Sequence, residues 1–470
     1  MIVDNLDLIK NKNFFVIIIG SGPAGISSAI QFEKKNIECL IIEAGDKESK
    51  SKNIDYLRGE VEGQAYNDLE NSRSRQFGGT GNLWGGNCNP MNIWDFKDWP
   101  IQKKDLAIYE KNAKEILNLK NNFFLDKYND NLNLYNLDWS DVKFGNKYYN
   151  HIKKSKYIHL SLNTIFESCN GVDGYVESIN CIKEKRYSLK SKYFILSCGG
   201  MENSRLLLWS KATTPKLFSK SLPIGNYYMD HPFHSVGEGL VNYKKLNIYN
   251  KINNIKNAPL ITCDSLMNLS ANKDFMLQKN ILNSGLYIGF QDANKYDSVF
   301  KQLRCIAPNF IKKIYDEKAT KDTYKIKIEI LQEQEALYNR KISLSEKKDP
   351  NNMSLIKLNW WKAPKEKLSA KIISEEFAKI FLKGDIGRVG LDEFLFNNED
   401  YETTVGYHQM GGTRMGSDHK DSVVDKNLKV HGFANLFVSG SSVFRTSSHV
   451  HPTYTIVKLA VRLTEHISKL

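Results

Sequence analysis

Residues 14–45 read FFVIIIGSGPAGISSAIQFEKKNIECLIIEAG, and this stretch decides the fold. The unbroken apolar run from Phe14 to Ile19 is typical of a buried parallel strand. A glycine turn follows, then a helical stretch from Ile26 to Lys35 and a second apolar strand that ends at Glu43. This alternation predicts a βαβ unit and therefore a Rossmann-like α/β domain.

The glycine turn carries the first chemical signal. Gly20, Gly22 and Gly25 fit the pattern G-x-G-x-x-G, in which the glycines allow a tight turn, close approach of a pyrophosphate and close helix–strand packing. The pyrophosphate would lie at the positive end of the helix, and Glu43 stands where a carboxylate accepts hydrogen bonds from an adenosine ribose. We predict a dinucleotide site that includes Gly20, Gly22, Pro23, Ala24, Gly25, Glu43 and Ala44.

Length and composition narrow the class of protein. The 470 residues exceed one ordinary core and suit two interleaved domains, and 41% hydrophobic residues exclude a disordered chain. The formal net charge is +13, mostly from scattered Lys. Scattered Lys indicates a solvated surface or, as the alternative, attraction of an anionic substrate. We expect no nucleic-acid partner, because the basic residues are not interleaved with aromatic residues as in a binding module.

The seven cysteines show no C-x-x-C pair and no zinc spacing, so we predict no metal and a reducing compartment. The start of the chain has no basic-then-apolar signal peptide, and no apolar stretch reaches the length of about 18 residues that a membrane helix needs. We therefore expect a cytoplasmic protein with no membrane partner.

Further stretches carry a resemblance to a known family. Residues 75–87 read RQFGGTGNLWGGN, residues 194–207 read FILSCGGMENSRLL, residues 407–416 read YHQMGGTRMG and residues 447–453 read SSHVHPT. Their order and glycine patterns resemble the glucose–methanol–choline (GMC) oxidoreductase family, in particular its sugar (pyranose)-oxidising members.

The resemblance implies FAD as the cofactor. Beyond the first turn, the implied FAD contacts are Arg75, Gly78, Gly79, Thr80, Asn82, Leu83, Thr164, Ile165, Cys198, Gly199, Gly440, Ser441, Pro452 and Thr453. Some pyranose-oxidising members carry, in the glycine-rich loop, a His that bonds covalently to FAD. That place is Leu83 here, which predicts non-covalent FAD.

The resemblance also implies a histidine base. Alcohol oxidation removes a hydroxyl proton and the geminal hydride, and a His has a suitable pKa to take the proton. By resemblance His408 is the base, and the second catalytic residue is His451 or His449. In an extended segment these two point to the same side. We prefer His451, because it directly precedes the C-terminal helix. We interpret His231, which follows Asp230, as structural.

The expected architecture is a Rossmann-like FAD-binding domain interleaved with an α+β substrate domain. The FAD-binding domain would comprise 1–97, 155–234 and 401–470, and the substrate domain 98–154 and 235–400. Alternating apolar and polar residues in 324–330, 341–345 and 355–360 predict an antiparallel sheet in the substrate domain.

The predicted function is FAD-dependent oxidation of a hydroxyl group (CH–OH), of a sugar or activated sugar, by hydride transfer to flavin N5. The electron acceptor would be oxygen or another carrier. The alternatives are an NAD(P)H-dependent flavin reductase or hydroxylase, and a non-catalytic flavoprotein. The sequence leaves the alcohol, the acceptor and the oligomeric state open.

Overall fold

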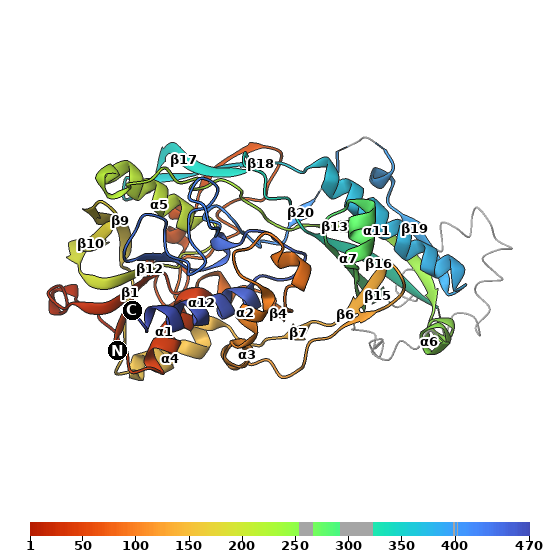
Figure 1. Ribbon diagram of the computed structural model, residues 1–470, viewed down its shortest axis with the longest axis horizontal. Coiled ribbons are helices and arrows are strands. Elements are labelled where there is room, and N and C mark those ends of the chain that lie inside the picture. Colours follow the sequence, from red (N-terminus) through yellow and green to blue (C-terminus); the bar gives the residue numbers. More distant parts are fainter. Residues whose placement is uncertain (253–266, 292–322, 398–399, 402) are drawn as a thin grey trace.

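The computed structural model describes residues 1–252, 267–291, 323–397, 400–401 and 403–470. Two sheets dominate it, and they lie toward opposite ends of the long axis (Figure 1). One is a parallel sheet, and both ends of the chain lie near it. The other is a larger antiparallel sheet.

The parallel sheet has five strands. Their order is β21 (Leu436–Val438), β12 (Ser191–Leu196), β1 (Phe14–Ile19), β2 (Cys39–Ile42) and β8 (Ile158–Ser161). Because β1 is central, Val16 pairs with Cys39 on one side and with Tyr193 on the other. Burial on both faces explains why these strands read as continuous apolar runs. The predicted βαβ unit is confirmed, with α1 (Pro23–Glu33) between β1 and β2.

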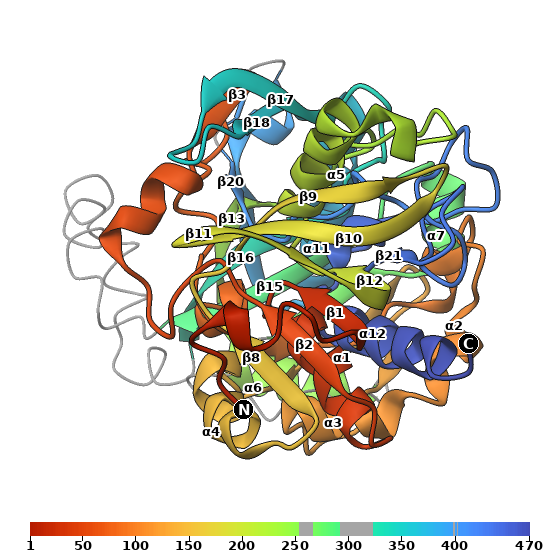
Figure 2. The ribbon, with the colours of Figure 1, turned by 90° about the vertical axis from the view of Figure 1, so that its left-hand side faces the viewer.

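Layers cover the parallel sheet on both faces. Figure 2 shows a three-stranded antiparallel sheet on one face and helices α1, α4 and α12 on the other. The strands of this small sheet are β9 (Ile165–Val172), β10 (Tyr175–Lys183) and β11 (Lys185–Leu189). The helices near this end, besides α1, are α2 (Lys103–Ala107), α3 (Glu110–Leu117), α4 (Phe144–Lys154), α5 (Glu202–Thr213) and α12 (Thr453–Ile467).

The large sheet is antiparallel throughout. Its order is β19 (Gly387–Leu391), β13 (Pro232–Asn242), β16 (Thr323–Gln332), β15 (Ser284–Gln291), β14 (Met267–Ala271), β6 (Leu132–Tyr135) and β5 (Leu125–Lys127), with β20 (Thr404–Val405) also beside β13. The helices beside it are α6 (Tyr243–Ile252), α7 (Lys273–Lys279) and α11 (Pro364–Lys383).

Strand β16 shows how the sheet divides its faces. Ile326, Ile328 and Ile330 are fully buried in a core that they share with Ile373 and Phe377 of α11. The side chains between them point to the opposite face, since successive residues of a strand alternate. Side chains on that second face can therefore line a binding site.

A third sheet joins distant parts of the chain. β17 (Lys341–Lys348) and β18 (Ser354–Trp360) form the predicted antiparallel pair, and β3 (Gly59–Gly63) runs parallel to β18. The alternating segment 324–330, predicted in the same sheet, lies instead in the large sheet as β16. A short pair, β4 (Asn87–Cys88) and β7 (Asp138–Trp139), completes the strands of the described residues.

The predicted fold class, a Rossmann-like α/β unit with an α+β unit that contains an antiparallel sheet, is confirmed. The residue boundaries of the two domains stay a prediction. In the part of the chain that the structure describes, no helix has the length and apolar character needed to cross a membrane.

Candidate functional site

A cavity of about 700 Å³ lies between the two large sheets. The carboxyl ends of β1 and β2 and the turn after β12 open into it, and β13, β15 and β16 contribute side chains from the other side. Ligands of open α/β sheets bind at this edge of the parallel strands. The cavity volume is in the range of small-molecule sites.

The first glycine turn forms a cradle at one end of the cavity. Gly20 has φ +97°, and a Cβ on Gly25 would lie 2.0 Å from the carbonyl oxygen of Gly20, so both positions require glycine. A Cβ on Gly22 would meet nothing within 4 Å, because it would project into open space. No side chain caps the N-terminus of α1, whose free N–H groups and dipole suit a pyrophosphate. The cradle therefore fits a dinucleotide.

Glu43 ends β2 as predicted and lines the cavity together with Ala44. Its carboxylate accepts hydrogen bonds from the backbone N–H of Ser21, at 3.0 Å, and from that of Gly45, at 2.8 Å. These bonds hold the carboxylate at the strand end. An ionised carboxyl group has capacity for further donors, such as ribose hydroxyls.

The glycine-rich loop contributes Arg75, Gly79, Thr80 and Leu83 to the cavity wall. Asn82 supports the loop from within, because its amide donates to the Phe77 carbonyl at 2.7 Å and its oxygen accepts from the Gly145 N–H at 2.7 Å. Asn82 thus locks the loop against α4. Three of the predicted cofactor residues do not line the cavity, namely Gly25, Gly78 and Asn82.

The remaining predicted cofactor residues all line the cavity. They are Gly20, Gly22, Pro23, Ala24, Thr164, Ile165, Cys198, Gly199, Gly440, Ser441, Pro452 and Thr453. Pro452 is the N-cap of α12, and no side chain caps this helix either. Helix α12 therefore presents a positive end to the cavity.

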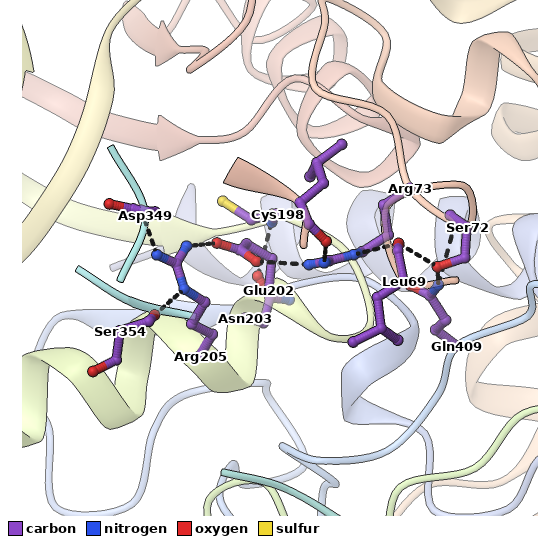
Figure 3. Close-up of polar contacts among 11 residues, drawn as sticks. Leu69, Ser72, Arg73, Cys198, Glu202, Asn203, Arg205, Asp349, Ser354 and Gln409 are labelled. Carbon is purple, nitrogen blue, oxygen red and sulfur yellow. Dashed lines mark hydrogen bonds and ion pairs between the residues drawn. The ribbon is translucent and has the colours of Figure 1, made fainter. Parts of the chain in front are cut away.

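A buried chain of charges, missed in the sequence, also lines this end of the cavity (Figure 3). Arg73 contacts Glu202 at 3.0 Å, Glu202 pairs with Arg205, and Arg205 contacts Asp349 at 2.6 Å. Burial raises the pKa of Glu202, but the two arginines outweigh it and hold that pKa below its ordinary value. The available signal was charge at Glu202 and Arg205, within an otherwise apolar strand–turn–helix segment.

His408 and His451 lie side by side in the same cavity. Their ring centroids are 4.9 Å apart, and the ring planes stand at 77°. Both rings line the cavity. The chain positions them from different directions: His408 follows β20, and His451 directly precedes α12.

Burial governs the charge of this pair. It lowers the pKa of His451 to about 4. It also holds the pKa of His408 well below its ordinary 6.5, with smaller contributions from His451 and His231. Both imidazoles are therefore neutral near neutral pH, and a neutral imidazole has a nitrogen lone pair that can accept a proton.

The large sheet forms the wall beside the histidines. Phe233, Tyr287 and Leu331 line the cavity from β13, β15 and β16, and the Tyr287 ring lies 6.3 Å from that of His451. Glu329 adds a carboxylate, which pairs with Lys327 at 2.6 Å. These four wall residues were not predicted from the sequence. The alternation along β16 nevertheless indicates that Glu329 and Leu331 face away from the buried isoleucines.

His449, the other candidate for the second catalytic residue, faces elsewhere. It is 1% exposed and lines a separate cavity of about 110 Å³ beside Tyr135. Ser448 has φ +56° and the chain bends at His449 and Val450, so the segment is not extended, and His449 and His451 line different cavities. Of the two, His451 is the one placed beside His408.

Two neighbours of His408, Asp230 and His231, were not predicted from the sequence to have a functional role. Asp230 accepts a hydrogen bond from the His408 backbone N–H at 2.8 Å, and His231 contacts the His408 ring.

Within the described residues, no group of three or more His, Cys, Asp or Glu side chains is arranged to hold a metal ion.

Comparison with known proteins finds a family match for part of this site. Residues 339–460 match the family model described as GMC oxidoreductase. The matched segment is similar to that family and contains both His408 and His451, together with β17, β18 and the first half of α12.

Curated relatives match a short segment. The chain is 41% identical over 64 residues to the fructose dehydrogenase large subunit of Gluconobacter japonicus and 44% identical over 64 residues to 2-methyl-1,2-propanediol dehydrogenase of Mycolicibacterium austroafricanum. It is 36% identical over 63 residues to pyranose 2-oxidase of Tricholoma matsutake. These segments are 13–14% of this chain and span only 11–12% of the relatives.

Solved structures resemble the whole chain. Pyridoxine 4-oxidase from Mesorbium loti has a TM-score of 0.59 at 14% identity, with 97% of this chain and 100% of that chain covered. A formate oxidase has a TM-score of 0.55 at 15% identity, with 97% and 98% covered. At such identities the likeness shows the fold alone, and that fold is the one described above.

Proposed function

We propose that this protein is an FAD-dependent oxidoreductase of the GMC family that oxidises a hydroxyl group to a carbonyl. One observation carries the proposal: the rings of His408 and His451, with centroids 4.9 Å apart, line the same cavity as a dinucleotide cradle. The GMC oxidoreductase match over residues 339–460 supports it, because it includes both histidines.

FAD fits the cavity through the residues already described. Gly20, Gly22 and the N-terminus of α1 would hold its pyrophosphate, and Glu43 its ribose. Bound FAD would supply a hydride acceptor at its N5 atom. We propose that it is held without a covalent bond, because Leu83, a side chain with no nucleophilic atom, lines the loop where such a bond is expected.

His408 acts as the base in this proposal. Being neutral, it can take the proton of the substrate hydroxyl, which leaves an alkoxide primed to lose its hydride. His451 orients the same oxygen from the other side and stabilises its developing charge. Phe233, Tyr287 and Leu331 exclude water from the reacting atoms.

The proposed substrate is a sugar or an activated sugar. Two of the matched relatives support this by their names, fructose dehydrogenase large subunit and pyranose 2-oxidase, whereas the third is named for a diol, 2-methyl-1,2-propanediol. Glu329 gives the substrate wall a polar group suited to further hydroxyls. In this proposal residues 1–97, 155–234 and 401–470 bind FAD, and 98–154 and 235–400 shape the substrate site. Oxygen or another carrier would then reoxidise the flavin.

We also propose a reducing, cytoplasmic setting. Five cysteines in the described part of the chain are unpaired, namely Cys39, Cys88, Cys169, Cys181 and Cys198. Four of them are buried. Free thiols suit a compartment in which disulfides do not form.

The test is anaerobic bleaching of the FAD-loaded protein by a panel of sugars, sugar nucleotides and simple alcohols. We expect at least one of them to reduce the flavin, and His408→Ala to slow reduction by about 100-fold or more while FAD stays bound. His419→Ala, at the surface, is the matched control and should behave as wild type. Readmitting air then tells an oxidase from a dehydrogenase.

Two outcomes would favour the alternatives. Bleaching by NADPH and by no hydroxyl compound would favour a flavin reductase or hydroxylase. Bound FAD that neither NADPH nor any alcohol reduces would favour a non-catalytic flavoprotein.

A further inference from the structure

His231 lies behind the proposed base and is fully buried. Its Nδ1 is 2.9 Å from Nδ1 of His408, and its Nε2 is 3.2 Å from the carbonyl oxygen of Ser447. The two imidazole planes stand at 82°. The second ring therefore meets His408 through the nitrogen that faces away from the substrate end of the cavity.

These contacts determine where the protons are. The Ser447 carbonyl can only accept, so Nε2 of His231 must carry the hydrogen and donate it. Burial lowers the pKa of His231 to about 3, so the ring is neutral and its Nδ1 has only a lone pair. The hydrogen between the two Nδ1 atoms must then belong to His408, which donates it to His231. The reverse arrangement would point the Nε2 lone pair of His231 at the carbonyl oxygen.

The backbone around the pair is fixed by one carboxylate. Asp230 Oδ1 accepts from the backbone N–H of His231 at 2.7 Å and from that of His408 at 2.8 Å. Asp230 Oδ2 accepts from the Tyr66 hydroxyl at 2.5 Å. A single buried side chain thereby sets the spacing of the two rings, although they are 177 positions apart in the chain.

We propose that His231 is a positioning residue that holds His408 in the Nδ1–H tautomer and so leaves Nε2 as the atom that takes the hydroxyl proton. This inference rests on the proposed function. When the substrate O–H bond breaks and the Nε2–H bond forms, His408 becomes an imidazolium. Its Nδ1–H···Nδ1 bond to His231 is then charge-assisted, which strengthens the base. A neutral imidazole thus takes the orienting part that a carboxylate takes beside many catalytic histidines.

Nitrogen-15 NMR of the FAD-loaded protein with labelled histidines tests the tautomer directly. The resonances that disappear in His408→Ala belong to His408. We expect a protonated Nδ1 and an unprotonated Nε2 in the wild type, and loss of this single tautomer in His231→Leu. A protonated Nε2 in the wild type would overturn the proposal, and so would an unchanged His408 spectrum in His231→Leu.

Kinetics of anaerobic flavin reduction test the consequence. His231→Leu should slow reduction about 10- to 100-fold with little change in substrate affinity, and should move the acidic limb of the pH profile to lower pH. His231→Asn places an amide oxygen near the former Nδ1 and should restore most of the rate. Two other ionisable groups lie near His408 and can also shape the pH profile: Asp230, which bonds to the His408 backbone, and His451, beside the His408 ring.

His234→Leu is the matched control. His234 is also buried and bonds through Nδ1, at 3.2 Å to Thr403, but it packs against Phe394 and Tyr401 and not against His408. Equal rates and pH profiles for His231→Leu and wild type would refute the positioning role. If no hydroxyl compound bleaches the wild type, the proposed function fails, yet the NMR measurement still decides the tautomer and its dependence on His231.

Discussion

At the scale of single residues, the proposed mechanism depends on His408 being neutral. Burial, then the neighbouring His451 and His231, holds its pKa well below 6.5. Only the neutral form can take a proton, so activity is lost as pH falls through this lowered pKa. We expect the rate of flavin reduction by substrate to stay constant from about pH 8 down to 6.5, where an ordinary His would already have lost half of it. Stopped-flow reduction across this range is the measurement.

Asp230 supplies the control for that experiment. Burial raises its pKa to about 6, against the hydrogen bonds that favour its ionised form, the first of which comes from Tyr66. A bend in the profile near pH 6 would therefore belong to Asp230. Tyr66→Phe removes one of these bonds and should move that bend to higher pH. If the rate is half-maximal at pH 6.5 in both the wild type and Tyr66→Phe, then His408 titrates as an ordinary histidine.

At the scale of elements, the turn from β1 into α1 separates binding from folding. Gly22→Ala adds a methyl group in open space, and φ −72° with ψ −173° suits alanine. Gly25→Ala places the same methyl 2.0 Å from the Gly20 carbonyl oxygen. We expect Gly22→Ala to weaken FAD binding about tenfold, with an N-cap cost of no more than about 1 kcal/mol in the apoprotein. Gly25→Ala should destabilise the apoprotein by about 1–3 kcal/mol.

FAD titration and thermal unfolding of the two apoproteins provide the measurements. Each variant is the control for the other, because the chemical change is identical and the positions are three residues apart. Unchanged FAD affinity in Gly22→Ala would mean that the pyrophosphate does not lie over this turn.

The elements also show what local sequence can predict. The β1–α1–β2 unit and the C-terminal helix α12 are regular stretches whose apolar period is visible in one window, and both are confirmed. The pairing of β16 with β13 and β15, not with β17, was not predictable, because sheet membership depends on partners far along the chain. Alternation marks a strand but does not name its neighbour.

The same limit separates the site residues. Glycine turns and the His408 loop are local patterns, and the sequence predicted them. His231 became a partner of His408 only when β13 and β20 paired and brought two distant segments together. The positive φ of Ser448 was not predicted either, and its hydroxyl donates to Asp95, which is 353 positions away in the chain, at 2.7 Å.

At the scale of the whole molecule, the site determines how stability depends on pH. Five histidines have strongly lowered pKa values through burial: His231, His234 and His449 at about 3, His451 at about 4, and His408 well below its ordinary 6.5. Below pH 6.5 these histidines bind protons in the unfolded chain but stay unprotonated in the folded protein. Each histidine therefore favours unfolding by up to about 1.4 kcal/mol per pH unit as pH falls from 6.5 toward its lowered pKa.

Four buried acids act in the opposite direction, because burial also raises the pKa values of Asp95 and Glu366. Burial raises the pKa of Glu333 from 4.5 to about 8 and that of Asp230 from 3.8 to about 6. Their stabilisation is complete at low pH and is lost as pH rises through these values. Because five histidines oppose four acids, we expect the net stability of the protein to fall as pH drops from 6.5 to 4.5.

His234→Asn isolates one of these contributions. His234 does not line the cavity, so the substitution removes a titrating group without touching the proposed chemistry. Its loss of packing should lower stability by a similar amount at every pH. The dependence on pH should nevertheless become shallower, by up to about 1.4 kcal/mol per unit below 6.5. Thermal midpoints of the FAD-loaded protein between pH 6.5 and 4.5 measure this slope, with His419→Asn at the surface as the control. Parallel curves for His234→Asn and wild type would show that His234 is not held neutral in the folded protein.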